Sequence, residues 1–448
     1  MQFELTREYI EALRKVIDNK DEQGVLELIH ELHPADIAEI YEEINKEQAL
    51  FLFELFDDET AADVFSELEE DEQEDLLKLL PKEVVAKKII HNMDSDDAAD
   101  FIGEMSNKDQ EEILAHIDDI EQAGDIVDLL NYEKDTAGGL MAKELVVVNE
   151  NWTVLRCFQE ISRQAEDIDE IYNVYVTNDE NILLGYLSLK EMIVSPTSAK
   201  ISTIYEDDVI SVKTDEDSEE VAKIMEKYDL VALPVIDGIG RLMGRITIDD
   251  VVDIIKEQAE KDYQMMSGIS EDVESTDNVW LQTRARIPWL IVAVFGGILA
   301  SRVIANFEGA LTSLSEAAMF IPLITGMGGN VGIQSSAIIV QGLANNSLGI
   351  ESTGRKLFRE LGIATINGLC LSSIILLYNY LAGENYILTI SVSVALFSVI
   401  IFATIFGTLV PLVLDKLKID PALATGPFIT TMDDIMGVLI YFIIVSSF

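Results

Sequence analysis

The chain has few of the residues that build covalent cross-links and soft-metal sites. Its 448 residues include two cysteines, Cys157 and Cys370, which lie in different halves, and four histidines that form no His-Glu-x-x-His pattern. A disulfide framework and a thiolate metal site are therefore excluded. The phosphate-binding motif Gly-x-x-x-x-Gly-Lys-Ser/Thr and the motif Asp-Lys-Thr-Gly are also missing, so the sequence offers no means of coupling to ATP hydrolysis.

Positive charge is scarce and unevenly distributed. The formal net charge is −50, and the first 286 residues carry 25 basic against 72 acidic side chains. Such a half repels nucleic acid and anionic lipid surfaces and attracts cations, so we predict divalent cations and no nucleic acid as partners. The alternative is an acidic surface that serves only solubility. No nucleophile–base set stands out in this half, which predicts that the protein is not an enzyme.

Three regions of the acidic half differ in pattern. Residues 1–135 alternate apolar and acidic side chains at helical spacing, and similar phrases begin at His33, Asp58 and Asp94. Each phrase looks like an N-cap followed by an amphipathic helix, so we predict an acidic, superhelical N domain. The first 17 residues are charged and helical in period, unlike a signal peptide, and this predicts a cytoplasmic location for the acidic half.

Residues 136–256 contain one unit of mixed α/β character twice. Each unit has an apolar strand, a glycine turn, a second strand and a Ser or Thr before a helix. Aligning Gly185-x-x-Ser188 with Gly244-x-x-Thr247 gives a repeat of 59 residues. This doubled pattern resembles a tandem pair of CBS modules. The resemblance implies an adenine-nucleotide site in which Thr247 and Asp250 contact the ribose; the alternative is that Thr247 only caps a helix.

The last half is apolar. An amphipathic helix within 251–275 joins it to the acidic half, and residues 284–448 form an all-α transmembrane domain with five segments long enough to cross a core of about 30 Å. Lys and Arg occur before the first segment and in alternate connections only. By the positive-inside rule the N-terminus is cytoplasmic and the C-terminus lies outside. The five segments are Ile287–Phe307, Ala317–Leu343, Leu357–Leu381, Tyr386–Leu414 and Ala422–Phe448.

The second segment combines glycines with amide side chains. Pro322 and four glycines between 326 and 332 weaken a helix and free backbone carbonyls, which membranes tolerate only against protein or a water-filled cavity. Asn330 and Gln334 add oxygen ligands. We predict a pore wall here; the alternative is close helix packing through small residues.

The fifth segment carries acidic residues at membrane depth. A carboxylate there costs a few kcal/mol, so Asp434 marks a functional site. Carboxylates, amides and carbonyls without Cys or His suit a hard cation such as Mg²⁺ or Ca²⁺. A symmetric dimer would present two copies of Asp434 to one axis. The pore-lining candidates beside Asp434 are Asn330, Gln334, Asp420, Thr430 and Asp433.

These features together resemble the MgtE family of magnesium channels. The resemblance rests on the acidic domain, the CBS pair, the linking helix and five spans, with P-x-x-x-G-x-G-G-N from Pro322 and DPA…GP…T…D from Asp420. It implies a homodimer with a pore on the two-fold axis, Asp434 as the pore carboxylate, and closure when cytoplasmic Mg²⁺ binds between the acidic domains and the linking helix. The regulatory positions implied are Asp96, Asp100, Glu219, Asp229, Asp250 and Asp253, together with Glu257.

The chain departs from the family pattern at three positions. Ile333 replaces the asparagine of the usual GNQ, and Gln258 and Lys261 stand where acids are usual in the linking helix. We therefore expect one polar pore position fewer, and a linking-helix site that is weaker or rebuilt from Glu257 and Glu260.

We predict a Mg²⁺-gated Mg²⁺ channel of the cell membrane, with lipid and a second copy of the chain as partners. Two alternatives stay open at this point. One is a transporter of Mn²⁺, Co²⁺ or Ca²⁺ on the same scaffold, and the other is a membrane sensor regulated through the CBS pair.

Overall fold

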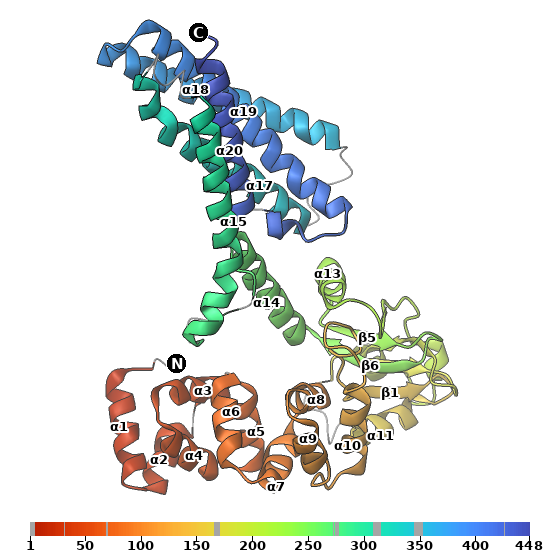
Figure 1. Cartoon of the computed structure of the whole chain (residues 1–448). Coiled ribbons are helices and arrows are strands. Elements are labelled where there is room, and N and C mark those ends of the chain that lie inside the picture. Colours follow the sequence, from red (N-terminus) through yellow and green to blue (C-terminus); the bar gives the residue numbers. More distant parts are fainter. Residues whose placement is uncertain are drawn as a thin grey trace. The chain divides into compact units, whose positions relative to one another are not determined.

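The computed structural model describes residues 5–30, 32–68, 70–164, 171–271, 273, 277–307, 315–344, 353–424 and 426–448. The connections at 308–314 and 345–352, on which part of the predicted topology depends, lie outside these residues. The chain divides into two compact units, Met1–Ile255 and Lys256–Phe448. Both are drawn in Figure 1, coloured along the sequence.

Unit 1 begins with a helical domain, as the amphipathic phrases predict (Figure 1). The sequence sets the helix starts through side-chain caps: Asn45 and Gln48 form a capping box, and Asp57 accepts a hydrogen bond from Thr60 N at 2.9 Å. The elements are α1 (Arg7–Asp18), α2 (Glu22–Ile29), α3 (Pro34–Glu43), α4 (Lys46–Leu55), α5 (Asp58–Ser66), α6 (Glu70–Leu79), α7 (Lys82–Val84), a π-helical turn η1 (Val85–Ile89), a 3₁₀ turn η2 (Ile90–Asn92), α8 (Ser95–Gly103), α9 (Asn107–Leu114) and α10 (Ile120–Leu129).

The core of the helical domain continues into the second α/β module. Buried residues from α1 to α10 form one hydrophobic cluster with Val212, Leu233, Ile246 and Val251 of that module. Burial of this kind is the main stabilising term in a folded domain. The two parts of unit 1 therefore share one core, and α8 is held beside the start of α14 (Ile248–Met266).

Two three-stranded sheets confirm the predicted repeat. The orders are β1-β2-β3 and β4-β5-β6, each with a parallel and then an antiparallel pair. A bulge interrupts the antiparallel pair after Val176 in one sheet and after Val235 in the other, again 59 residues apart. The strands are β1 (Val146–Asn149), β2 (Val174–Thr177), β3 (Leu183–Leu187), β4 (Val212–Lys213), β5 (Ala232–Ile236) and β6 (Leu242–Thr247), and the helices between them are α11 (Val154–Gln164), α12 (Leu189–Val194), η3 (Ile201–Thr203) and α13 (Ser218–Tyr228).

The glycines of the repeat serve a close backbone approach. A side chain at Gly185 would collide with the carbonyl of Glu206, and one at Gly244 would lie 2.6 Å from the carbonyl of Ala142. Next to Gly185, Tyr186 of the first module pairs with Glu206, which precedes the first strand of the second module. Next to Gly244, Arg245 of the second module pairs with Ala142, which precedes the first strand of the first module. The paired glycines therefore lock two modules together rather than make turns.

The described residues of unit 2 include five helices that are long and apolar enough to cross a membrane, as predicted. Helix α19 is the central one: it contacts α17, α18 and α20, and its buried face includes Val392, Leu396 and Val399. The elements are α15 (Val279–Asn306), η4 (Ser315–Phe320), α17 (Ile321–Ala344), α18 (Thr353–Ala382), α19 (Tyr386–Lys416), η5 (Pro421–Ala424) and α20 (Gly426–Val445).

The prediction of a weakened backbone in the second span is wrong. Helix α17 is a continuous α-helix from Ile321 to Ala344, and Pro322 stands in its first turn, where proline is tolerated. Gly328, Gly329 and Gly332 are close-packing positions instead, whereas Gly326 faces open space: a side chain at Gly329 would lie 3.1 Å from the Thr430 methyl, and Gly407 of α19 lies against the backbone of Gly332.

Candidate cation sites

The two adjacent carboxylates of α20 lie in different environments. Asp433 is 1 % exposed and packs inside the protomer, whereas Asp434 is partly exposed. Neighbouring residues of a helix point about 100° apart, so one side chain faces the helix packing and the next faces away from it. Within one protomer, Asp434 is the carboxylate at membrane depth that is open to an ion.

Helix α17 has one packed and one uncovered face. Asn330 and Gln334, four residues apart, are both exposed, and Ile333 is partly exposed beside them. Gly328, Gly329 and Gly332 lie on the packed side. The uncovered stripe continues along the helix at Pro322, Gly326, Ile338 and Gln341. An amide pair on a face that the chain itself leaves bare can meet ions or a second copy.

The remaining pore candidates make local hydrogen bonds. The Thr430 hydroxyl donates to the carbonyl of Gly426 at 3.0 Å, while its methyl faces Gly329. Asp420 is exposed and accepts from the backbone N–H of Ala422 at 2.8 Å, so it fixes the start of η5.

Unit 1 holds a compact acidic group between α8 and the chain leading into β1. One carboxylate oxygen from each of Asp94, Asp96 and Glu144 lies within 4.8 Å of the others. Asp96 is 9 % exposed, and Asp250 of α14 lies near enough to act on its charge. All-oxygen ligands at such spacing suit a hard divalent cation.

Burial and mutual repulsion disfavour the charged forms of these acids. Desolvation, followed by the charges of Asp250 and three further carboxylates, raises the pKa of Asp96 well above its ordinary value. Desolvation also raises the pKa of Asp250, although the Thr247 hydrogen bonds act in the opposite direction. A cation bound among these groups would relieve both effects.

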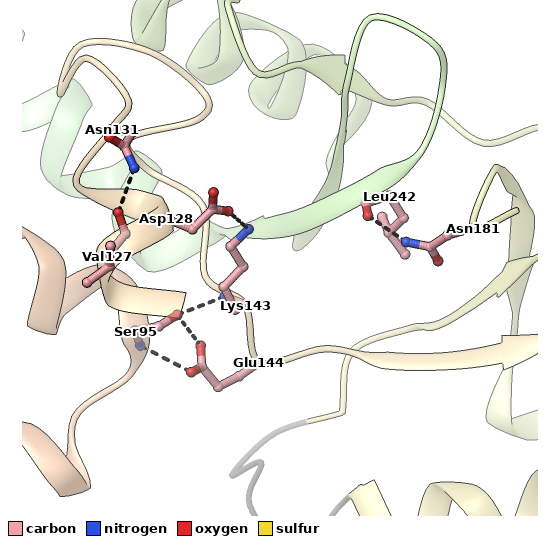
Figure 2. Close-up of polar contacts among 8 residues, drawn as sticks. All are labelled: Ser95, Val127, Asp128, Asn131, Lys143, Glu144, Asn181 and Leu242. Carbon is pink, nitrogen blue, oxygen red and sulfur yellow. Dashed lines mark hydrogen bonds and ion pairs between the residues drawn. The ribbon is translucent and has the colours of Figure 1, made fainter. Parts of the chain in front are cut away.

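Glu144 joins the group because α8 holds it there (Figure 2). The Ser95 backbone N–H and hydroxyl donate to its two oxygens at 3.2 and 2.8 Å, so Glu144 caps α8 in place of Asp94, whose side chain makes no cap bond. The Ser95 hydroxyl oxygen also accepts from Lys143 N at 2.9 Å, and the Lys143 ammonium pairs with Asp128 of α10 at 2.7 Å. Figure 2 shows how these contacts connect the helical domain to the strand module.

The other predicted regulatory residues are exposed and more dispersed. Glu219 pairs with Lys223 at 3.4 Å, and Asp229 ends α13 in the left-handed conformation. Partial desolvation by the surrounding chain raises the pKa of Asp100 although its surface is exposed, while Lys134 lowers it and Glu104 adds a smaller increase. Asp253 and Glu257 are exposed on α14. Sequence reasoning missed Asp94 and Glu144, because Glu144 reaches the group only through the tertiary contact with Ser95.

The nucleotide candidates interact with each other. Oδ2 of Asp250 accepts from the backbone N–H and the hydroxyl of Thr247 at 3.0 and 2.9 Å, which fixes the start of α14. In both contacts Thr247 is the donor, so the carboxylate of Asp250 in the first turn of α14 satisfies the N–H of Thr247 just before the helix.

The C-terminal end of α14 meets two membrane helices within unit 2. Ser270 donates through its N–H and hydroxyl to the carbonyl of Ala285 in α15, at 3.0 and 2.8 Å. A side chain at Gly268 would lie 2.5 Å from Pro427 of α20. Of the departures noted in this helix, Gln258 donates to Asp262 at 2.9 Å and Lys261 is exposed.

Comparison with known proteins adds the family. Residues 321–444 match the model of a divalent cation transporter family, MgtE, residues 32–135 match the MgtE intracellular N domain, and residues 137–195 and 201–257 match CBS domains. The chain is 34 % identical over 422 residues to a magnesium transporter MgtE of Bacillus subtilis, covering 94 % of this chain and 93 % of that protein. The chain belongs to the MgtE family. Its MgtE relative from Enterococcus faecalis, also a magnesium transporter, is 35 % identical over 98 % of this chain and 97 % of its own length.

Two solved structures resemble a little over half of this chain. The cytosolic domain of the Mg²⁺ channel MgtE in complex with ATP aligns with a TM-score of 0.52 and 33 % identity, over 55 % of this chain and 99 % of that one. The soluble part of a magnesium transporter aligns with a TM-score of 0.51 and 31 % identity, over 56 % and 98 %. The aligned share of this chain is about the combined length of its helical domain and CBS pair. Both solved proteins are named as a magnesium transporter or channel.

Proposed function

We propose that this MgtE-family protein is a homodimeric channel that admits Mg²⁺ into the cell and closes when cytoplasmic Mg²⁺ is high. The proposal rests on which side chains the chain leaves uncovered. In α20, Asp434 is partly exposed while Asp433 is buried, and in α17 the amides of Asn330 and Gln334 are exposed. A carboxylate on one membrane helix and amides on another are ligands for a hard cation.

The cargo would pass with much of its water. Mg²⁺ sheds water reluctantly and is usually held through one or two carboxylates, with several waters retained. Two copies of Asp434 facing a dimer axis match that demand better than a closed cage of protein ligands. Uptake needs no ATP, because a divalent cation entering a cell gains about 4.6 kcal/mol per 100 mV, twice the value for a single charge.

The gate would be the acidic group of unit 1. A ligand at ten times its Kd stabilises the bound state by about 1.4 kcal/mol per site. Shifting a gate from 1:99 to 99:1 needs about 5.5 kcal/mol. About four such sites would suffice, and the group around Asp96, with Asp250 and the dispersed acids, supplies the ligands. Without Mg²⁺ the same carboxylates repel one another, which favours the open state.

Three exposed apolar side chains on the first CBS module support a dimer. Leu155 of α11 is 54 % exposed, and Ile193 and Val194 of α12 are 73 and 66 % exposed. A second copy would cover side chains that a monomer leaves in water. We also propose that unit 1 is cytoplasmic and that the C-terminus lies outside, which Arg284, Arg286 and the Lys/Arg residues of alternate connections support.

We also propose that the CBS pair binds an adenine nucleotide near Thr247 and Asp250. A relative with 33 % identity over the soluble part carries ATP. Oδ2 of Asp250 is already engaged by Thr247, so Oδ1 is the atom available to a ribose hydroxyl. Isothermal titration of the full-length protein with ATP, for wild type and Asp250→Asn, tests this, and unchanged affinity in the variant would remove Asp250 from the site.

The channel is tested by ion flux through purified protein in liposomes, with Mg²⁺, Mn²⁺, Co²⁺ and Ca²⁺ as separate cargoes. We expect Mg²⁺ flux that Asp434→Ala abolishes. Asp415→Asn, an exposed carboxylate at the end of α19, is the matched control and should conduct normally. Preference for another ion would favour the alternative cargo, and absence of any flux would favour a membrane sensor.

A further inference from the structure

Asp433 is the most confined carboxyl group of unit 2 among the described residues. It is 1 % exposed, and neither carboxylate oxygen has a hydrogen-bond partner in the described part of the chain. A second copy of the chain can only bury it further. A buried polar group without a partner is costly, so its presence beside the pore carboxylate requires an explanation.

The carboxyl group fills a notch in α17. A Cβ atom at Gly332 would collide with Oδ2 of Asp433, would lie 3.1 Å from its Cγ and would lie 2.7 Å from the end of the Ile429 side chain. A Cβ atom at Gly328, one turn earlier, would lie 3.7 Å from the Asp433 Cβ. The Asp433 side chain therefore occupies the space that a larger residue at 332 would take.

The notch itself is rigid. Gly332 lies between two helices, because Gly407 of α19 approaches its carbonyl on one side while Asp433 of α20 approaches its Cα on the other. Val399 of α19 closes the notch at Gly328, where a Cβ would lie 3.2 Å from its methyl group. Such packing leaves little freedom for α20 to rotate at this level.

We propose that Asp433 is a positioning residue: seated in the Gly328–Gly332 notch, its side chain fixes the rotation of α20 and so the direction in which Asp434 meets the ion. The inference rests on the proposed role of Asp434 as the pore ligand. Adjacent residues of a helix are about 100° apart, so a rotation of α20 that frees Asp433 turns Asp434 away by the same angle. Tyr441 holds the far end of α20 through its hydroxyl, which donates to the Ala317 carbonyl at 2.7 Å.

Shape and charge make different demands on position 433. Asparagine has the shape of aspartate without the charge, and alanine removes both. If the side chain acts as a wedge, Asp433→Asn keeps the channel working and Asp433→Ala does not. A new methyl at position 332 partly refills the space that alanine leaves at 433, so the double variant Gly332→Ala/Asp433→Ala should be better than either single variant.

The experiment measures Mg²⁺ flux, its half-saturating concentration and the Mg²⁺/Mn²⁺ flux ratio in liposomes, per folded dimer counted by size-exclusion chromatography. We expect Asp433→Asn within about twofold of wild type. Asp433→Ala and Gly332→Ala should each lose more than about tenfold in flux, raise the half-saturating concentration and change the ratio, and the double variant should recover at least half of the wild-type flux. A purely structural loss lowers the number of folded dimers but leaves the ratio per dimer unchanged.

Two results would overturn the inference. Equal losses in Asp433→Asn and Asp433→Ala would mean that the carboxylate itself holds the ion, and normal behaviour of all variants would mean that the notch has no role. If Asp433→Ala does not fold, Asp433→Asn and the double variant still decide. Normal conduction in Asp434→Ala would instead refute the proposed pore. That result is separate from the test of positions 332 and 433, which depends on how the single and double variants compare.

Discussion

Replacing Ser95 by alanine should loosen the helical domain from the strand module of unit 1. Ser95 is fully buried, and its hydroxyl both donates to Glu144 at 2.8 Å and accepts from Lys143 N at 2.9 Å. A hydrogen bond to a charged group contributes about 1.5–3 kcal/mol, and a donor left unpaired costs about 1–3 kcal/mol. We therefore expect a loss of about 3 kcal/mol in the docked arrangement, or roughly a hundredfold in its equilibrium constant.

The assay is limited trypsin cleavage at Lys134, an exposed residue in the connection between α10 and the CBS pair, measured against Mg²⁺ concentration in the full-length protein. The Ser95→Ala variant should need far more Mg²⁺ than wild type for half-maximal protection. Ser106→Ala is the matched control, because Ser106 also begins a helix of this domain but bonds only to Asp109. Its loss should be about 1 kcal/mol and local to α9.

Equal midpoints for the two serine variants would refute the reasoning. They would show that the contacts of Ser95 with Glu144 and Lys143 add nothing to domain docking beyond an ordinary helix cap. A shift in Ser95→Ala that Mg²⁺ cannot reverse at any concentration would indicate unfolding instead, and circular dichroism of the same sample separates that case.

Three further predictions concern the acids and the topology. Acid should replace part of the Mg²⁺ effect: the raised pKa of Asp96 means that its protonated form favours the docked state, so protection of Lys134 without Mg²⁺ should increase as pH falls and be lost as pH rises through that raised pKa. A tag at Phe448 should be labelled in intact cells, and labelling only after permeabilisation would reverse the orientation. Neutralising four acids together should flatten the Mg²⁺ response of protease protection, since both ion binding and repulsion are lost; an unchanged midpoint and steepness would make them a solvated surface. These four are Asp96, Asp100, Asp250 and Asp253.

The local parts of the fold could be predicted from the sequence. The strand, turn and second strand predicted for the first module are observed as β2 and β3, because an apolar run and a following turn specify a strand locally. The 59-residue repeat could also be predicted, since glycine and Ser/Thr occur at the same positions in both modules. The amphipathic phrases predicted to begin at His33 and Asp58 agree to within one residue with the observed N-caps, His33 and Asp57.

The tertiary contacts could not be predicted in this way. Glu144 follows the segment TAGGLMAK and has no periodic or capping signal of its own, yet it completes the acidic group because Ser95, 49 residues earlier, holds it. The glycines of α17 were misread for a related reason. Glycine weakens an isolated helix, but between packed membrane helices it allows close approach, and only the positions of Gly407 and Asp433 reveal which effect wins.

The glycine packing also limits how the pore can open. At the level of Gly332, α17 touches α19 through Gly407 and α20 through Asp433, so these three helices interlock in one layer. A movement of α20 alone would break contacts on both sides, whereas the end of α14 meets α15 and α20 only through the short segment that contains Met266, Gly268 and Ser270, among the described residues. Well-packed layers move as rigid bodies, and loosely joined ends supply the hinges. We therefore expect the linking helix to act on α17, α19 and α20 together, tilting the interlocked layer rather than turning Asp434 by itself.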